Sequence, residues 1–263
     1  MNVSYFPGCT LKNKARDLDR YARQCAQVLG ITLEEVENWQ CCGGVFTTAK
    51  DEVATKLSSV RLLQAAKAKE QPLVTVCSAC HNVVKQTNHA MQIDGEFAAK
   101  VNRYMADDGE YDGSTQVYHY LELLRDVVGY DTLKDKVTNP LKGKKIAAYY
   151  GCLLLRPSSV MSMDDPENPT IMEDMIRALG ATPVVYANRN ECCGGYVSVE
   201  SPALAKKNSL AVVEDAKAAG ADMIITACPL CRYNLVKNGA DIPVVYFTEL
   251  LAEALGLKED ANE

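Results

Sequence analysis

Ten of the eleven cysteines fall into two sets with the same order and nearly the same spacing. Residues 40–44 read QCCGG and residues 191–195 read ECCGG, and in each case a CxxC pair follows after 34 intervening residues. A Gly-Cys precedes each double cysteine. The first set is Cys9, Cys41, Cys42, Cys77 and Cys80, and the second is Cys152, Cys192, Cys193, Cys228 and Cys231. Clustered thiolates are metal ligands, so each half of the chain is predicted to hold a metal or cluster site.

Disulfide bonds are the alternative use for so many thiols. They characterise small secreted domains, whereas this chain has 263 residues and an odd number of cysteines. The first residues, MNVSYFPGC, contain neither a basic segment nor a long apolar one, so no secretory signal is expected. The longest apolar run, residues 146–155, is about half of a membrane-spanning helix. We therefore expect a soluble, cytoplasmic protein with ligating thiolates and no transmembrane segment.

Five thiolates in a set exceed the four that complete a zinc site or a cubane [4Fe–4S] cluster. Neighbouring side chains of an extended segment point in opposite directions, so Cys41 and Cys42 serve two different irons more easily than one metal atom. The paired glycines that follow allow the backbone to approach a bulky cofactor and aim N–H groups at sulfur. The pattern favours a multinuclear iron–sulfur centre. The alternative is one spectator cysteine in each set beside a cubane cluster or a zinc ion.

Other cofactor and partner classes fit the sequence less well. Residues 77–81 read CSACH, the form of c-type haem attachment, but the second half has Arg232 in place of His81. There is no glycine-rich nucleotide loop, so no bound flavin, NAD or ATP is expected. The net charge of −6 argues against nucleic-acid binding and is compatible with docking onto a partner protein. Cys25 lies outside both sets, on the apolar stripe of a helix predicted over residues 14–29, and is predicted to be a buried apolar residue.

The elements that must position the cysteines repeat as well. A strand over residues 73–76 leads into Cys77 and a helix follows, and a strand over residues 222–226 leads into Cys228 in the same way. At such a corner, residues three apart share one helix face and the positive end of the helix favours an anionic thiolate cluster. Residues 244–256 align without gaps with residues 117–129. Both double cysteines and both CxxC pairs are offset by 151 positions.

Strands that alternate with helices predict an α/β fold with parallel sheets. The repeat divides it into two pseudo-symmetric, Rossmann-like halves, each with one cysteine set. We place the first repeat domain at residues 1–135 and the second at residues 143–263. The segment 134–145, with five lysines, Asn139-Pro140 and Gly143, is predicted to be the linker.

The doubled pattern Cys…Cys-Cys-Gly…Cys-x-x-Cys, which fills the chain, resembles the B subunit of heterodisulfide reductase, a cysteine-rich protein with two CCG repeats. The resemblance implies a noncubane [4Fe–4S] cluster in each half, with the two clusters facing each other across the interface of the halves. Carried over position by position, Cys9, Cys41, Cys42, Cys77 and Cys80 would hold one cluster. The other would be held by Cys152, Cys192, Cys193, Cys228 and Cys231.

The resemblance also implies that the chain is the catalytic component of a multisubunit disulfide oxidoreductase. A heterodisulfide such as that of coenzyme M and coenzyme B, or an analogous small-molecule disulfide, would be reduced to two thiols, one electron coming from each cluster. Thiol release requires protons, and the predicted donors are His81, Tyr5 and Tyr149. Electrons would arrive from an iron–sulfur protein resembling the C subunit of heterodisulfide reductase, and ultimately from a flavin-containing protein resembling its A subunit. The substrate and the residues that contact it do not follow from the resemblance.

Two other functions remain open at this stage. The chain could pass electrons without catalysis, as related cysteine-rich subunits of lactate, glycolate or succinate-oxidising complexes are thought to do. It could also be a zinc or scaffold protein that uses one or both cysteine sets structurally.

Overall fold

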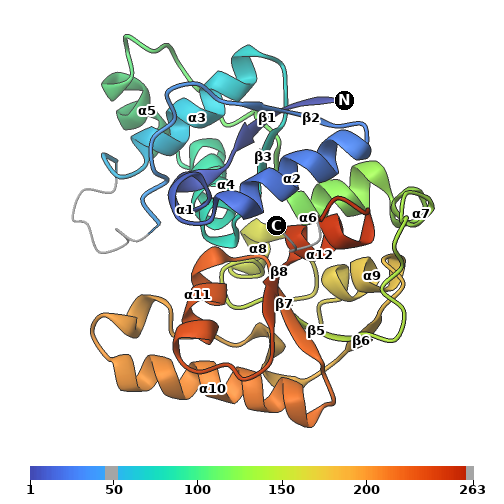
Figure 1. Ribbon diagram of the computed structural model, residues 1–263. Coiled ribbons are helices and arrows are strands. Elements are labelled where there is room, and N and C mark those ends of the chain that lie inside the picture. Colours follow the sequence, from blue (N-terminus) through green and yellow to red (C-terminus); the bar gives the residue numbers. More distant parts are fainter. Residues whose placement is uncertain (45–52, 259–263) are drawn as a thin grey trace.

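In the computed structural model, which describes residues 1–44 and 53–258, the first half of the chain forms a four-stranded parallel sheet (Figure 1). The strand order is β2-β1-β3-β4. Its strands are β1 (Asn2–Phe6), β2 (Thr32–Glu35), β3 (Leu73–Thr75) and β4 (Val117–His119). The register pairs Tyr5 of β1 with Glu35 of β2 and with Val74 of β3. Parallel strands require helical crossovers, and the helices of this half supply them.

The second half repeats this topology with the strand order β6-β5-β7-β8. Its strands are β5 (Lys145–Tyr149), β6 (Thr182–Val184), β7 (Met223–Thr226) and β8 (Val244–Tyr246). In both sheets the first strand of the half lies in the interior, and the strand that leads into the CxxC pair lies beside it. The α/β fold and the two pseudo-symmetric halves are therefore confirmed.

Helices and turns surround both sheets. Those of the first half are α1 (Gly8–Asn13), α2 (Arg16–Val28), α3 (Leu57–Ala68), α4 (Ser78–Ile93), α5 (Gly95–Tyr104), α6 (Tyr120–Glu122), the π-helix η1 (Leu123–Val128) and α7 (Tyr130–Asp135). Those of the second half are α8 (Ser158–Met161), α9 (Ile171–Ala178), the 3₁₀ turns η2 (Ala187–Asn190) and η3 (Tyr196–Ser198), α10 (Pro202–Ala218), α11 (Pro229–Lys237) and α12 (Phe247–Ala254). No helix in the described ranges has the length and apolar character needed to cross a lipid bilayer.

The two halves share one hydrophobic core, because α12 of the second half packs on α2 of the first (Figure 1). The amphipathic helix α2 turns Leu18, Ala22 and Cys25 inward. Thr248 of α12 donates a hydrogen bond from Oγ1 to the Leu18 carbonyl at 3.1 Å. The Cys25 thiol lies 3.9 Å from the Thr248 carbonyl and is fully buried, so the prediction of a buried apolar role is confirmed.

The structure differs from the sequence predictions mainly at the ends of elements. Pro7-Gly8 predicts a turn that presents Cys9, but a helix, α1, begins at Gly8, whose positive φ of 78° redirects the chain into it. Residues 51–69, rich in Ala, Leu and Lys, predict a helix; α3 begins at Leu57, and residues 51–52 lie outside the described residues. Residues 156–169, rich in Pro, Ser and Asp, predict a loop, but they contain α8, and the predicted linker overlaps α7. The domain boundaries at residues 135 and 143 stay a prediction.

Candidate metal centre

Both CxxC pairs lie at the strand–helix corners that the sequence predicts. Cys77 follows β3 and is the N-cap residue of α4, and Cys228 follows β7 and is the N-cap residue of α11. Pro229 occupies the first turn of α11, where its missing N–H costs no hydrogen bond. The two helices have 16 and 9 residues, long enough for a positive N-terminal end that stabilises nearby thiolates.

Within each half the thiols lie in close pairs. Cys41 Sγ lies 3.7 Å from Cys9 Sγ, and Cys42 Sγ lies 3.5 Å from Cys80 Sγ. The second half repeats the inner pair, since Cys193 Sγ lies 3.7 Å from Cys231 Sγ. The outer pair is repeated by Cys152 and Cys192, whose thiols hydrogen-bond each other. As expected, the two members of each double cysteine face different partners.

The fifth cysteine of each set lies at the junction of the halves. The Cys77 and Cys228 thiols are close enough for each to shift the pKa of the other, although 151 positions separate them in the chain. Ser78 reinforces this junction, because its backbone N–H and its hydroxyl donate to the Ala227 carbonyl at 3.0 and 2.9 Å. The Tyr246 hydroxyl also donates to that carbonyl, at 3.0 Å. The two cysteine sets therefore adjoin each other at the junction of the halves.

The pKa values of the double cysteines favour thiolates at Cys42 in the first set and at both Cys192 and Cys193 in the second. Hydrogen bonds from Cys41 and then Cys80 lower the pKa of Cys42 to about 3, although burial opposes the shift. The hydrogen bond from Cys152, followed by backbone N–H donors, lowers the pKa of Cys192 to about 6. The pKa of Cys41 is raised in turn by its bond to Cys42. Since metal ligation requires deprotonated thiols, these surroundings suit it.

Glycines shape both sites. The Gly194 N–H lies 3.3 Å from Cys192 Sγ, as the paired glycines lead one to expect. The glycine before each leading cysteine has a role that the sequence analysis missed. A Cβ on Gly8 would lie 2.7 Å from Cys80 Sγ, and one on Gly151 would lie 3.2 Å from Cys231 Sγ. The repeated Gly-Cys was the available signal. In both halves a glycine, which has no side chain, directly precedes the leading cysteine, and this repetition suggests that a side chain there would not fit.

The donor set fits an iron–sulfur cluster better than a single zinc ion. All eleven cysteines are free thiols, so the ten repeated ones are available as ligands. Three close thiol pairs, Cys9 with Cys41, Cys42 with Cys80 and Cys193 with Cys231, lie beside glycines that leave room next to sulfur. A multinuclear group can be bound by ligands spread in this way, whereas tetrahedral zinc needs four that converge on one point.

The predicted proton donor His81 is fully buried beside the first CxxC pair. Its ring packs edge-on against His119, with centroids 5.4 Å apart, and its Nε2 lies 3.4 Å from Glu122 Oε2 without hydrogen-bond geometry. Burial, followed by the charges of His119 and Lys85, lowers the pKa of His81 well below its usual value. The imidazole is therefore neutral at neutral pH, and its contact with Glu122 is not an ion pair.

The two predicted tyrosine donors lie in different places. The buried Tyr5 hydroxyl donates to Asp19 Oδ1 at 2.7 Å, toward α2. The Tyr149 hydroxyl donates to the Glu191 carbonyl at 2.8 Å and lies under the second cysteine set, where burial and then the Cys231 charge raise its pKa. Tyr149 is therefore the better placed of the two, and the assignment of proton donors stays a prediction.

Tyr196 is a candidate that the sequence analysis missed. Its side chain lines a narrow cavity with cysteines of the second set, and burial followed by the charges of Cys228 and Cys77 raises its pKa. Its hydroxyl would lie 3.7 Å from a Cβ on Gly44, so it reaches from the second half to the first double cysteine. The only signal in the sequence was its place directly after ECCGG, where the first half has Val45.

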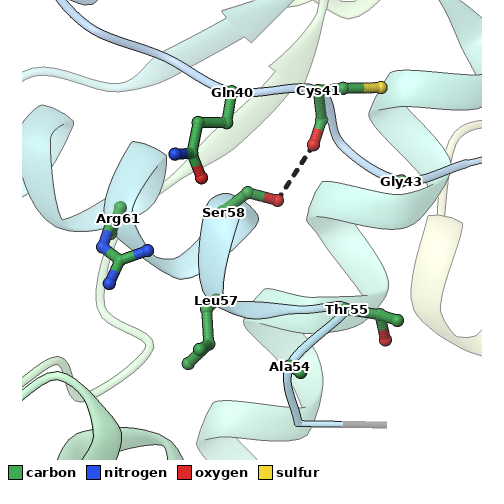
Figure 2. A pocket seen from close by; sticks show the side chains of 8 residues that line it. All are labelled: Gln40, Cys41, Gly43, Ala54, Thr55, Leu57, Ser58 and Arg61. Carbon is green, nitrogen blue, oxygen red and sulfur yellow. Dashed lines mark hydrogen bonds between the residues drawn. The ribbon is translucent and has the colours of Figure 1, made fainter. Parts of the chain in front are cut away.

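A second hollow, of about 420 Å³, lies beside the first double cysteine and is drawn in Figure 2. Ser58 Oγ donates to the Cys41 carbonyl at 2.9 Å, and Figure 2 shows the Cys41 side chain pointing away from Ser58. Arg61 is paired with Asp108 at 2.8 Å. Ser58, in the wall of this hollow, therefore holds the Cys41 backbone in place, while the Cys41 thiol points toward Cys9.

Comparisons with known proteins agree with this geometry. The family model described as a cysteine-rich domain, CCG, matches residues 3–85 and 146–236. The chain is 31% identical to the 8-methylmenaquinol:fumarate reductase membrane anchor subunit of Wolinella succinogenes, over 97% of this chain and 92% of that protein. It is also 31% identical to the B subunit of the ferredoxin/F(420)H(2)-dependent CoB-CoM heterodisulfide reductase of Methanosarcina acetivorans, over 98% of this chain and 90% of that protein.

Among solved structures, a hypothetical protein from Helicobacter pylori matches with a TM-score of 0.77 and 11% sequence identity. The match covers 98% of this chain and 49% of that one. At this level of identity the likeness supports the fold of both halves and their arrangement.

Proposed function

Because the chain belongs to the family of cysteine-rich CCG proteins and carries two of its repeats, we propose that it is the iron–sulfur subunit of an oxidoreductase complex and reduces a disulfide to two thiols. Relatives named as the B subunit of heterodisulfide reductases, at 31% and 30% identity over 98% of the chain, support this role. One structural observation carries the proposal. Cys77 and Cys228, one from each cysteine set, are neighbours that shift each other's pKa across the junction of the halves, so a molecule bound beside them would lie near both sets.

The ten cysteines are the proposed ligands of two noncubane [4Fe–4S] clusters, five for each. When bound, each cluster would exchange single electrons, which is the chemistry that a two-electron substrate needs from a pair of centres. The overall reaction breaks one S–S bond, consumes two electrons and two protons, and releases two thiols. The chain itself must bind the disulfide, stabilise negative charge on sulfur and supply protons.

Several residues are placed for these tasks. The N-terminal ends of α4 and α11 point at the junction of the halves, where their N–H groups stabilise developing negative charge. Tyr196 lies between the two double cysteines, and its raised pKa keeps the hydroxyl protonated at neutral pH. We propose Tyr196 as the donor of a proton to a leaving thiolate, with Tyr149 as a further candidate, whereas the neutral His81 is unsuited to this role.

The direct test uses anaerobically purified protein, reduced methyl viologen as electron donor and a panel of small-molecule disulfides. Thiol release is measured with a chromogenic reagent, together with oxidation of the viologen. Two viologen radicals consumed for each disulfide cleaved would support the proposal. If every disulfide is left intact while the protein still accepts and returns electrons, the catalytic assignment is wrong.

A second candidate function is electron transfer without catalysis. The 31% identity to the fumarate reductase subunit of Wolinella succinogenes favours it, since that relative belongs to a complex named for a different reaction. The same experiment separates the two functions, because an electron-transfer protein is reduced and reoxidised without consuming a disulfide. A cytoplasmic location and partners resembling the A and C subunits of heterodisulfide reductase stay predictions.

A further inference from the structure

A groove of about 460 Å³ runs between the first two helices of the first half and α11 of the second half, on the outer side of the cysteine region. We call it the α1–α11 groove. The groove lies beside the candidate metal centre. Two of its lining residues are neighbours of cysteines in the chain: Thr10 directly follows Cys9, and Leu230 directly precedes Cys231. Leu230 also lines the cavity that contains the second cysteine set. A molecule in the groove is therefore separated from that set by one side chain.

The charge of the groove is opposite to that of the whole chain. Lys14, Arg232 and Lys237 line it, and no acidic residue does. Across the described ranges, none of these three cations has a carboxylate partner. The chain as a whole carries a net charge of −6. Unpaired cations gathered in one groove of an acidic protein complement an acidic partner.

The groove also presents apolar side chains to solvent. Tyr233 is 59% exposed and Val236 is 52% exposed, one turn apart on the outer face of α11. The Lys237 ammonium lies over the Tyr233 ring, 5.5 Å from its centroid, so cation and aromatic surface form one patch. Exposed aromatic and aliphatic side chains with a charged rim are typical of protein–protein interfaces. A small anion would leave these side chains uncovered, so a protein partner fits the groove better.

We propose that the α1–α11 groove is the docking site for an acidic electron-donor protein, whose carboxylates pair with Lys14, Arg232 and Lys237 and whose apolar side chain packs against Tyr233 and Val236. The inference rests on the proposed iron–sulfur function, since only a redox-active chain needs such a partner beside its cysteines. Docking here places the donor next to both Cys9 and Cys231, one residue from each half. Long-range attraction between the opposite charges would speed association at low ionic strength.

The test uses the cluster-loaded protein and flavodoxin, a small acidic electron carrier whose flavin absorbance is separate from that of iron–sulfur clusters. The variant is Lys14→Glu/Lys237→Glu, which leaves Arg232 in place because its Nε donates to the Val244 carbonyl at 3.1 Å. The matched control is Lys206→Glu/Lys207→Glu, an equal change of charge at exposed positions of α10. Binding of oxidised flavodoxin is measured by calorimetry, and reduction of the clusters by flavodoxin hydroquinone in stopped flow. Iron content and circular dichroism verify that all proteins are folded and loaded.

We expect the groove variant to bind oxidised flavodoxin about ten-fold more weakly, and to be reduced about ten-fold more slowly, at low ionic strength. The control variant should retain the values of the unchanged protein. Three results would overturn the proposal: the groove variant and the control variant lose binding equally, the groove variant binds flavodoxin as tightly as the unchanged protein, or the unchanged protein does not bind flavodoxin. Calorimetric binding of inorganic pyrophosphate that the groove variant loses, with flavodoxin binding unaffected, would identify a small-anion site instead and would also overturn it.

Reduced methyl viologen keeps this test separate from the proposed function. The small cationic donor does not need the groove, so the groove variant should cleave disulfides with it at the rate of the unchanged protein. Loss of flavodoxin binding with intact viologen-driven disulfide cleavage supports both proposals. If no protein cleaves disulfides while flavodoxin docking still depends on the groove, the docking proposal holds and the catalytic one fails.

Discussion

The residue after each CxxC pair shows how the two halves differ. In the first half it is His81, which is fully buried against His119 and Glu122. In the second half it is Arg232, which lies in the wall of the α1–α11 groove. The helices α4 and α11 begin at equivalent corners, but α4 is covered by α3, α5 and α8, whereas α11 leaves one face to solvent. The residue after the CxxC pair therefore packs in the interior of the protein in the first half and lines a surface groove in the second.

A second contrast concerns the residue after the CCGG string. The second half has Tyr196 there, reaching across to the first half, whereas the corresponding Val45 lies outside the described residues. The halves also differ in length after the CxxC pair. The repeat offset falls from 151 at the CxxC pair to 127 at the last strand, because in the first half α4 is longer than α11, α5 follows it and a longer loop leads to β4. The two halves therefore share the fold and the cysteine set, but the polar residues around the cysteines differ between them.

The largest expected effect comes from filling the space beside sulfur. Gly8→Ala would place a Cβ 2.7 Å from Cys80 Sγ, against 3.2 Å from Cys231 Sγ for Gly151→Ala. Both glycines have positive φ, at 78° and 64°, so alanine adds about 1–2 kcal/mol of backbone strain in either half. We expect Gly8→Ala to lose about half of the iron of the chain and Gly151→Ala to lose less, measured on anaerobically purified protein.

Gly30→Ala is the matched control, because Gly30 also has positive φ, at 76°, but no atom lies within 4 Å of the place that an alanine Cβ would take. It should keep its full iron content. Equal iron loss in all three variants would show that backbone strain, not contact with sulfur, is responsible.

The next effect should come from Tyr196→Phe, which removes the hydroxyl between the two sets. If it donates a proton, disulfide cleavage should slow by about 10²-fold with iron content unchanged. Tyr104→Phe, on the exposed face of α5, is the control and should have no effect. The steady-state rate and its pH profile with reduced methyl viologen measure the difference. An unchanged rate in Tyr196→Phe would remove the hydroxyl from the mechanism.

A smaller effect concerns acid stability, which the first half should dominate. Burial lowers the pKa of His119 to about 3, whereas Tyr246, its counterpart in β8, does not titrate in acid. Unfolded His119 takes up a proton near pH 6.5, but the folded residue stays neutral, so its contribution is present above pH 6.5 and is lost as pH falls. Between pH 8 and pH 5 this amounts to about 2 kcal/mol of the free energy of unfolding.

The test compares His119→Asn with the unchanged protein by urea denaturation at both pH values. Asparagine can keep the N-cap interaction, in which His119 Nδ1 accepts from the Leu121 N–H at 3.2 Å. The variant should lose about 2 kcal/mol less between pH 8 and pH 5. Glu122 and His81 are present in both proteins, and because His119 helps to lower the pKa of His81, the difference reports the buried pair of His119 and His81. Identical pH dependence would contradict the buried neutral state.

The smallest effect is expected at Cys25, between the two halves. Its thiol is fully buried and its pKa is raised to about 12 by desolvation, so it is neither a thiolate nor a ligand. Cys25→Ala should leave the iron content unchanged and lower the free energy of unfolding by about 1 kcal/mol, since it removes a small buried group. Iron analysis and urea denaturation of the same samples provide the measurement. Loss of iron would return Cys25 to the ligand set.

The cysteine pattern carried most of what could be predicted. The spacing and repetition of the cysteines predicted how the ten thiols divide into two sets, the strand–helix corners at Cys77 and Cys228, and the two parallel α/β halves. The proximity of Cys77 to Cys228 could not be predicted from local spacing, because it depends on how α12 packs against α2 across the halves. For the same reason the burial of His81 and the reach of Tyr196 were not visible, since neither is set by local spacing.

We propose that each half holds one four-iron cluster on its own five cysteines. Iron and acid-labile sulfide, measured on the anaerobically purified chain, give the most direct test. We expect about eight irons and about eight sulfides for each chain, falling to about four of each when Cys80 and Cys42 are replaced by alanine. One zinc ion for each half without sulfide, or complete iron loss when only the first set is altered, would contradict it.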